Sequence, residues 1–336
     1  MAWYHIPGHD QDVIISTRVR FARNLAEYPF ISRLDAPRAK EIVNRVGSIL
    51  EKNGFSRIDF ADISRITAQS LVEKHYASPV FVKESLPHAL FLNEPCNLSV
   101  MVCEEDHIRL QCILPGLSLR DAYIGACKIE TLLDSAFPLA FDQKLGYLTG
   151  CPTNLGTAMR ASIMLCLPML TACERMESLS LQLGQMGLLL RGIYGEGTVP
   201  SGCLYQLSNR ITMGLTEEEI LDRLNNAVSE IMATERNLRT SVIGIERDKL
   251  TDRLLRSEGI LRFAHTLTAS EMLEKLTDLR LGASLGLNEA RIEAMTTLLV
   301  EGMPATLSLG TSASPKQDLE REILRAKMVK EQLFGA

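Results

Sequence analysis

The sequence predicts an α+β protein with two parts. Through about residue 240, segments with the two-residue period of strands alternate with segments whose apolar residues have helical spacing. After that point almost every segment has helical spacing, and helix-capping residues recur. We therefore expect two domains, residues 1–240 with mixed structure and residues 241–336 with helices alone.

Composition narrows the class of protein. The 336 residues are 46% hydrophobic, which is enough for a sizeable core, and the formal net charge is −5. Such a chain has no general attraction for nucleic acid or for an anionic membrane. No signal peptide opens the sequence and no apolar run reaches membrane-spanning length, so we expect a cytoplasmic protein. The 8 cysteines include no Cys-x-x-Cys pair, which argues against a zinc site and a disulfide framework.

The first strand is predicted at residues 13–23. Arg18 and Arg20 alternate there with apolar residues, so both guanidinium groups lie on one face of the strand. Two like charges side by side repel each other unless an anion lies between them. The segment is therefore either one wall of an anion site or a solvated edge strand, and these two residues alone do not decide.

Two helices are expected next. Asp35 caps the first helix and Gly54 ends it. The second helix begins near Ser64 and carries His75. A lone histidine on a helix is more often a packed or surface residue than a ligand.

Three strands are predicted at residues 89–92, 98–103 and 107–114. The last two are predicted to form a hairpin whose tip is acidic, at residues 104–106. A polar hairpin tip is ordinary. Arg109, however, follows the tip on one face of its strand, so the tip and the arginine could also form the rim of a site.

A long helix is predicted from Ser118, and after it comes a lone thiol, Cys151. Residues 158–167 are predicted to form a helix that starts near Thr157. The positive end of such a helix would lower the pKa of the thiol and attract phosphate oxygens. Arg160 would oppose the dipole in the first turn, which suggests that it serves an anion. The alternative is a half-buried thiol beside a tight turn.

Residues 188–197 are predicted to be a strand that runs into a glycine-rich loop, and residues 203–210 are the return strand. Three glycines around Glu196 would allow the loop to close over a ligand. A plain flexible hairpin loop is the alternative.

The remaining predicted elements are helices. Thr216 begins a capping box with Glu219, which opens a long helix. Further caps are expected at Thr268 and Ser314.

The charged residues sort into two groups. The arginines could form a pocket for a polyanion such as a nucleoside triphosphate, because the guanidinium fork fits phosphate oxygens; they are Arg18, Arg20, Arg109, Arg160 and Arg191. Glu105, Glu196 and a thiolate at Cys151 would form a negative pocket for a cation. Phosphoryl transfer to a guanidinium needs both. The sequence contains no Walker A motif and no protein-kinase signature.

Five sequence blocks carry a resemblance. They are Ser16-Thr-Arg-Val-Arg20, Glu104-Glu-Asp-His-Ile-Arg109, Cys151-Pro-Thr-Asn-Leu-Gly-Thr157, Arg191-Gly-x-x-Gly-Glu196 and Leu207-Ser-Asn-Arg-x-x-x-Gly-Leu-Thr216. In this order they resemble the phosphagen (guanidino) kinase family, such as creatine and arginine kinases. The helical domain that precedes the first block in that family is missing, and a helical region follows the blocks instead. This layout resembles the bacterial protein-arginine kinases.

The resemblance implies a fold and an activity. The fold would be an antiparallel sheet flanked by helices, followed by a helical C-terminal domain for dimerisation. The activity would be ATP-dependent phosphorylation of arginine side chains in proteins. Two alternatives stay open: a kinase for a free guanidino compound such as arginine or creatine, and an inactive adaptor that binds phosphoarginine.

The resemblance also implies site residues. The catalytic residues would be Glu105, Cys151 and Glu196. ATP would be bound by Ser16, Thr17, Arg18, Val19, Arg20, His75, Arg109, Arg160, Ala161, Ser162, Ile163, Met164, Arg191, Gly192, Ile193, Tyr194, Gly195 and Glu196. Mg²⁺ would bridge the phosphates without a direct protein ligand, and Glu104 would reach it through water.

The last predicted helix carries one more motif. Arg321-Glu-Ile-Leu-Arg-Ala326 is similar to the phosphoarginine-binding Arg-Asp-x-x-Arg-Ala motif of protein-arginine kinases, with Glu322 where the motif has Asp. The resemblance implies a regulatory site at Arg321, Glu322, Arg325 and Ala326. A solvated helix face with mixed charges is the alternative.

The resemblance implies partners and a cellular role. The partners would be protein substrates with exposed arginines, a zinc-containing activator, a heat-shock repressor, a Clp ATPase and a second copy of this chain. The role would be stress response through degradation of marked proteins.

Overall fold

The computed structural model describes residues 1–95, 97–193, 201–310 and 318–335. Its strands are β1 (Ile14–Arg23), β2 (Phe55–Asp59), β3 (Ala89–Asn93), β4 (Leu98–Val102), β5 (Ile108–Pro115), β6 (Phe141–Asp142), β7 (Gly146–Tyr147), β8 (Met159–Cys166), β9 (Leu188–Gly192) and β10 (Leu204–Asn209). Its α-helices are α1 (Ala36–Lys52), α2 (Arg65–Glu73), α3 (Leu119–Asp134), α4 (Pro168–Ala172), α5 (Met176–Gln185), α6 (Glu217–Phe263), α7 (Ala269–Ser284), α8 (Ile292–Glu301), α9 (Pro304–Leu309) and α10 (Asp318–Phe334). Short 3₁₀ helices are η1 (Trp3–His5), η2 (Ile31–Arg33), η3 (Phe81–Lys83), η4 (Pro152–Asn154) and η5 (Ser201–Cys203).

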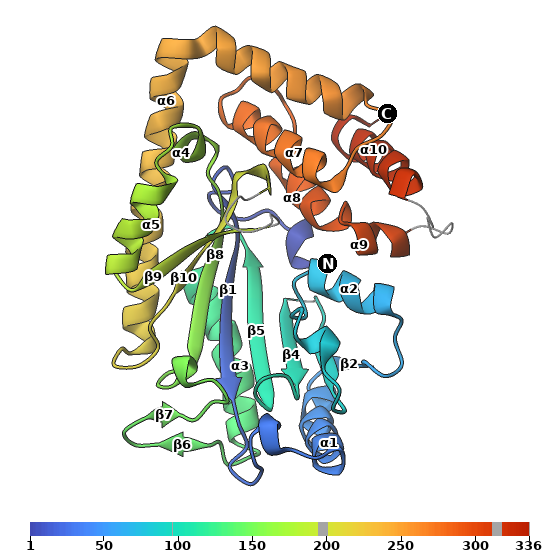
Figure 1. Ribbon diagram of the computed structural model, residues 1–336, viewed down its shortest axis with the longest axis vertical. Coiled ribbons are helices and arrows are strands. Elements are labelled where there is room, and N and C mark those ends of the chain that lie inside the picture. The colour runs from blue at the N-terminus through green and yellow to red at the C-terminus, as the bar shows by residue number, and fades with distance from the viewer. Residues whose placement is uncertain (96, 194–200, 311–317, 336) are drawn as a thin grey trace.

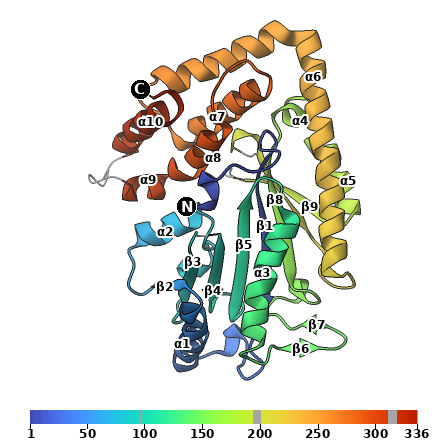
Figure 2. The same cartoon turned by 180° about the vertical axis from the view of Figure 1, so that it is seen from behind.

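An eight-stranded sheet organises the fold (Figure 1). Its order is β2-β3-β4-β5-β1-β8-β10-β9, and all neighbouring strands are antiparallel. The α3 helix crosses one face of the sheet, with α1 and the first half of α6 on either side of it (Figure 2). Apolar residues of these helices and of the strands beneath them form the main core. The predicted α+β fold with a flanked antiparallel sheet is confirmed.

The helix predicted at residues 158–167 is wrong. Residues 159–166 of this segment form β8, a strand in the middle of the sheet between β1 and β10. Ala158 has a φ of 46°, which a right-handed helix does not contain. A short, continuously apolar run cannot be assigned to helix or strand by periodicity. This run is a strand that is buried on both faces of the sheet, so its residues are apolar without alternation. No α-helix therefore begins near Cys151, which precedes only the three-residue 3₁₀ helix η4, and Arg160 opposes no helix dipole.

Most predicted helix starts are confirmed by hydrogen bonds. Asp35, Ser64 and Thr268 each accept the amide of the residue three positions later, and Thr216 forms the full capping box with Glu219. Gly54, with a φ of 83°, follows the end of α1 as expected.

Two details differ from prediction. The Ser118 side chain does not cap α3, because its hydroxyl donates to the carbonyl of Pro115. His75 lies beyond the end of α2, with a left-handed φ of 63°. The predicted cap at Ser314 lies outside the described residues.

The C-terminal helices form a second core against one end of the sheet. Leu273, Leu276 and Leu298 of α7 and α8 pack with Met164 and Leu204 of β8 and β10. The 47-residue helix α6 continues through residue 240 and has one non-helical residue, Glu246. The domain boundary at 240 stays a prediction. Among the described helices, none has both the length and the apolar character that crossing a membrane requires.

Glu73 joins the two parts through hydrogen bonds. This last residue of α2 accepts the amides of Ala305 at 3.0 Å and Thr306 at 2.7 Å, and also the Thr306 hydroxyl at 2.9 Å. These groups belong to the first turn of α9, whose amides have no partner within the helix. Glu73 therefore fixes α9 on the part of the fold that carries His75.

We predict that Glu73→Ala lowers the free energy of unfolding by about 1–3 kcal/mol, because charge-assisted hydrogen bonds to three donors are lost. Thermal or urea unfolding measures the change. The matched control is Glu51→Ala on the exposed end of α1, which should stay within about 0.5 kcal/mol of the parent. Equal stability of the two variants would contradict the role given to Glu73.

Candidate active site

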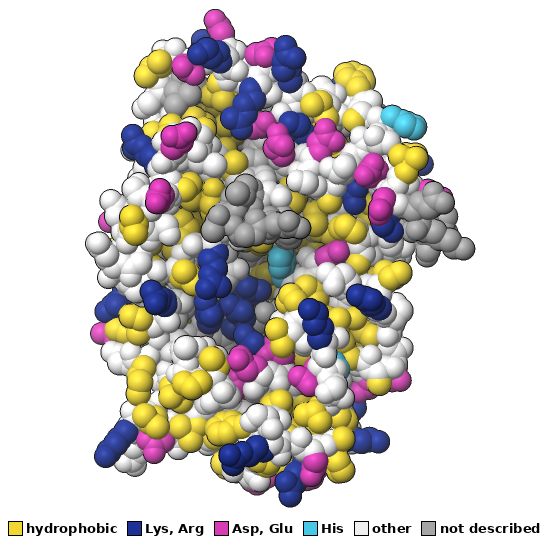
Figure 3. Space-filling view, in the orientation of Figure 1, with side chains coloured by type: hydrophobic (Ala, Val, Ile, Leu, Met, Phe, Trp, Pro, Cys, Tyr) yellow, Lys and Arg dark blue, Asp and Glu magenta, His cyan; other side chains and the backbone are white. Residues whose placement is uncertain are grey.

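Antiparallel register gathers the predicted arginines on one face of the sheet. Arg20 of β1 lies opposite Arg160 of β8, and Arg18 lies opposite Ser162. Arg109 of β5 pairs with Ala22, which is on the same face as Arg20. Arg191 of β9 joins this face through Gln206 of β10. Basic side chains gather in the central hollow of the molecule (Figure 3), on the face opposite α3.

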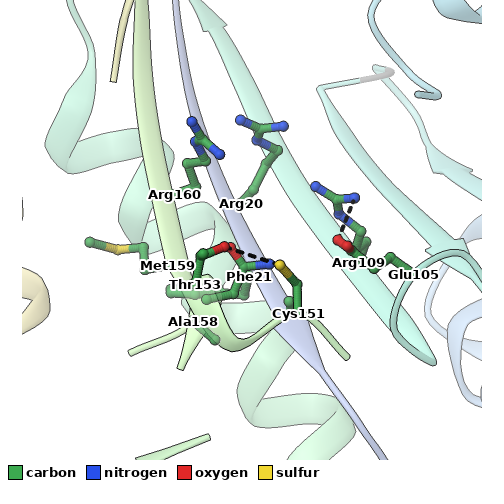
Figure 4. A pocket seen from close by; sticks show the side chains of 11 residues that line it. Arg20, Phe21, Glu105, Arg109, Cys151, Thr153, Ala158, Met159 and Arg160 are labelled. Atoms are coloured by element: carbon green, nitrogen blue, oxygen red, sulfur yellow. Dashed lines mark hydrogen bonds and ion pairs between the residues drawn. The ribbon is translucent and has the colours of Figure 1, made fainter. Parts of the chain in front are cut away.

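The lower part of this face is a cavity of about 190 Å³. It is lined by Arg20, Phe21, Ala22, Glu105, Arg109, Cys151, Thr153, Asn154, Ala158, Met159 and Arg160. Arg20, Arg109 and Arg160 project from three strands toward one space, with Cys151 and Thr153 below them (Figure 4). Further along the face, a second cavity is lined by Ser16, Arg18, His75, Ile113, Ser162, Met164, Ile193 and Gln206.

The arginines repel one another, and the charge of Glu104 compensates this repulsion only in part. Burial lowers the pKa of Arg20 well below its ordinary value, and the charges of Arg18, Arg109 and Arg160 lower it further. Burial also lowers the pKa of Arg160, with the charges of Arg191 and Arg109 acting in the same direction. Within the described part of the chain, Arg20, Arg160 and Arg191 form no ion pair. The Nε atoms of Arg20 and Arg160 are buried without a hydrogen-bond partner there. Such a cluster fits a polyanion.

Glu104 is committed to its neighbours. Its side chain is fully buried, accepts the Ser78 hydroxyl and forms an ion pair with Arg109. Burial alone would raise the pKa of Glu104, but Arg109 and the Ser78 hydrogen bond outweigh burial and lower it. Glu104 therefore stays ionised and holds Arg109 in place.

Glu105 is the carboxylate that faces the cavity. Its side chain is 42% exposed, against 0% for Glu104, and it lies 3.8 Å from Arg109 Nη1. Partial burial raises the pKa of Glu105; Asp106 and Glu104 raise it further, and Arg109 opposes them. A carboxylate with a raised pKa accepts a proton more readily, which suits a general base.

The Cys151 thiol lies across the cavity on the loop that contains η4. Its Sγ is 3.1 Å from the Thr153 hydroxyl (Figure 4). The carbonyl of Cys151 accepts the Thr149 hydroxyl at 2.8 Å and the Asn154 amide at 3.0 Å. These bonds fix the loop, and thereby the position of the thiol, without the predicted helix.

His75 has a defined place in the second cavity. Its carbonyl accepts the Gln111 side chain at 2.6 Å, which holds the left-handed turn. Burial and the charge of Arg18 lower the pKa of its imidazole to about 3. The ring is therefore neutral near pH 7, and it lines a cavity rather than packing in the core.

The residues predicted to bind the nucleotide lie on two different faces of the sheet, because side chains alternate along each strand. Ser16, Arg18, Arg20, His75, Arg109, Arg160, Ser162, Met164 and Ile193 line the two cavities. Thr17, Val19, Ala161 and Ile163 point to the opposite face, three of them into the main core. Arg191 and Gly192 lie on the edge strand β9. Tyr194, Gly195 and Glu196 lie outside the described residues.

Sequence reasoning missed Gln206, Ile113 and Ser78. Alternation with buried leucines in β10 could have indicated Gln206. The contact between Ser78 and Glu104 joins segments that are distant in sequence, so no local pattern indicates it.

The C-terminal motif is partly buried in the structure: Arg321 and Glu322 are half-buried, and Arg325 and Ala326 are buried. Arg325 is buried and donates to the carbonyls of Gly302 and Leu267, each at 2.7 Å. Burial lowers its pKa, Arg321 adds to that effect, and Glu322 and Glu73 oppose it. Ala326 is buried, and the carbonyl of Glu322 accepts the Leu267 amide at 3.2 Å. Arg321 pairs with Asp318 at the start of α10.

Known families match both parts of the chain. Residues 39–238 match the ATP:guanido phosphotransferase, C-terminal catalytic domain. Residues 247–335 match the protein-arginine kinase McsB C-terminal domain. The protein-arginine kinase of Brevibacillus brevis is 39% identical over 341 residues, which cover 98% of this chain and 94% of that protein. The protein-arginine kinase of Desulforamulus reducens is 38% identical over 341 residues, which cover 98% of this chain and 95% of that protein.

Solved structures support the fold. The duplicated taurocyamine kinase from Schistosoma mansoni has a TM-score of 0.63 and 24% identity over 80% of this chain, which spans 40% of that protein. Lombricine kinase has a TM-score of 0.61 and 20% identity over 70% of this chain and 69% of that one. The two family matches and the nearly full-length relatives show that this chain belongs to the protein-arginine kinase family of ATP:guanido phosphotransferases.

Proposed function

We propose that this protein transfers the γ-phosphoryl group of ATP to arginine side chains in proteins. The observation that carries the proposal is the partly compensated arginine cluster, which meets Glu105 and Cys151 in one cavity. The arginines suit the phosphates, and the carboxylate and thiol suit a cationic guanidinium. Phosphoryl transfer between two such ligands depends mainly on positioning and charge neutralisation.

Mg²⁺ would arrive with the nucleotide. No cluster of three or more acidic, histidine or cysteine side chains that could hold a metal is found in the described part of the chain. One Glu104 oxygen accepts Ser78, and the other accepts Arg109 and the Glu105 amide. Glu104 therefore suits a contact through water, and the metal would neutralise phosphate charge.

Glu105 would act as the general base. An arginine side chain has a pKa above about 12, so the attacking nitrogen must lose a proton as the N–P bond forms and the bond between Pγ and the bridging oxygen breaks. Glu105 takes that proton. The sulfur of Cys151 would orient and polarise the guanidinium, and we propose Glu196 as the second carboxylate partner of the guanidinium.

A kinase for a free guanidino compound is the second candidate, because taurocyamine and lombricine kinases share the fold. Protein substrates are favoured by the relatives named protein-arginine kinase, which this chain matches over nearly its full length. The test is incubation with γ-labelled ATP and either free arginine or an unfolded protein. Acid-labile, alkali-stable label on the protein supports the proposal, and label on free arginine alone refutes it. ATP turnover absent with every substrate would favour the inactive adaptor.

The proposal includes partners and organisation. The family resemblance suggests a zinc-containing activator, a heat-shock repressor as substrate, a Clp ATPase that degrades marked proteins in stress response, a homodimer and a cytoplasmic location. A domain division near residue 240 would fall close to where the family matches separate, at 238 and 247, and to the non-helical Glu246.

We further propose that the C-terminal motif binds phosphoarginine as an allosteric site. Arg325 is already oriented by two carbonyls, and Arg321 is on the same helix, four residues away. Arg321 would exchange Asp318 for the ligand phosphate, and Glu322 would face its guanidinium.

We predict that Glu105→Gln lowers kcat by more than roughly 10²-fold, because general-base catalysis is lost, while ATP binding is retained. In the parent, kcat should fall as pH decreases through the raised pKa of Glu105, above the ordinary 4.5, since only the carboxylate accepts a proton. Cys151→Ser should cost less, because no covalent intermediate forms. Substantial activity of Glu105→Gln would assign the base elsewhere, and a trapped phosphocysteine would contradict the role of Cys151.

Arg160→Ala and Arg191→Ala should each lower kcat by roughly 10³-fold or more, as expected for arginines on the transferred phosphoryl group. Lysine at either position should recover only part of the rate, because a point charge does not reproduce the planar fork. Arg33→Ala on the exposed surface is the control and should keep the parent rate. Full activity of both lysine variants would place the phosphates elsewhere.

Titration calorimetry with phosphoarginine on Glu105→Gln protein tests the C-terminal motif. We expect saturable heat that disappears with Arg321→Ala and persists with the control Lys327→Ala on the same helix. Arg325→Ala is less suitable, because it would leave two buried carbonyls without donors. No saturable heat at millimolar ligand would refute the site.

A further inference from the structure

The two catalytic side chains come from distant segments that are joined beside the cavity. Glu105 is at the tip between β4 and β5, and its neighbour Asp106 is fully buried. Asp106 Oδ1 accepts the amide of Gly150 at 2.6 Å, and Gly150 immediately precedes Cys151. A single hydrogen bond therefore connects the residue after the base to the residue before the thiol.

Two further contacts fix the same junction. A Cβ on Gly150 would lie 2.6 Å from the Glu105 carbonyl oxygen, so the two segments touch through their backbones. Asn24 donates to Asp106 Oδ1 at 2.6 Å and to the Leu148 carbonyl at 3.0 Å. The junction is therefore rigid in the direction that separates the base from the thiol.

We propose that Asp106 is a positioning residue, which sets the separation between the Glu105 carboxylate and the Cys151 thiol and thereby the width of the guanidinium site. The proposal rests on the proposed function, because both groups must hold the same guanidinium. A misplacement of about 1 Å can cost roughly 10²-fold in rate. Asp106 touches neither substrate in this account; it acts through Glu105 and Cys151.

Asp106 has two effects that substitutions can separate. It accepts the Gly150 amide, and its negative charge adds to the burial that raises the pKa of Glu105. Asparagine keeps an oxygen for Gly150 and removes the charge. Its NH₂ would take the place of Oδ2, which is buried without a hydrogen-bond partner among the described residues, so one unsatisfied atom replaces another. Alanine removes both effects.

The experiment compares the two variants in phosphorylation of an arginine-containing protein. We expect Asp106→Asn to keep kcat within about fivefold of the parent and Asp106→Ala to lose roughly 10²-fold. Both should move the acid limb of the pH profile to lower pH, since the charge beside Glu105 is gone. Equal losses in the two variants, or no loss in Asp106→Ala, would overturn the proposal. Unchanged ATP affinity of Asp106→Ala shows that it is folded.

Gly150→Ala tests the separation without changing any charge. Gly150 is exposed, but its added Cβ would push the Cys151 loop away from Glu105. We expect a kcat loss of tenfold or more with unchanged ATP affinity. The control Gly184→Ala, on exposed α5 with no atom near its Cβ, should keep the parent rate. Parent-like kcat in Gly150→Ala would refute the proposal. A parent protein that labels no arginine would instead refute the proposed function.

Discussion

Repulsion among half-buried arginines is the constraint on which the rest of this structure depends. Arg20 and Arg160 lie opposite each other on neighbouring strands, where like charges destabilise a sheet. Arg18 and Arg109 add charge on the same face, and the buried Glu104 carboxylate compensates Arg109 through an ion pair and Arg20 in part through its charge. The large core behind the sheet offsets this cost. A bound polyanion would remove the repulsion among the arginines, which is why we propose that this face binds phosphates.

The two glutamates beside the arginines have different roles. Glu104 is used to hold Arg109, which leaves Glu105 to face the cavity with a raised pKa. The thiol is brought opposite by the contact between Asp106 and Gly150. In our proposal the anion and cation sites therefore share one wall, and the hydrogen bond from the Gly150 amide to the Asp106 side chain sets the spacing of the reacting groups.

Much of the fold could be predicted, because local rules agreed with the tertiary structure. The caps at Asp35 and Thr216 and the alternation in β1 have local causes. The segment 159–166 could not be assigned, since a run buried on both faces has no period. The site residues were indicated by the family blocks, yet the alternation of β1 and β8 sends Val19 and Ile163 into the core. The position of His75 depends on its turn and on Gln111, which no local pattern contains.

The central claim is that the arginine face binds phosphates and is strained without them. Thermal unfolding with added tripolyphosphate or adenosine tests this most directly. A ligand that binds only the folded state stabilises that state by about 2.7 kcal/mol when its concentration is 100 times its Kd. We expect tripolyphosphate to raise Tm, with an effect that decreases as salt increases, and adenosine alone to raise it far less. No rise with tripolyphosphate, or an equal rise with adenosine, would contradict the account.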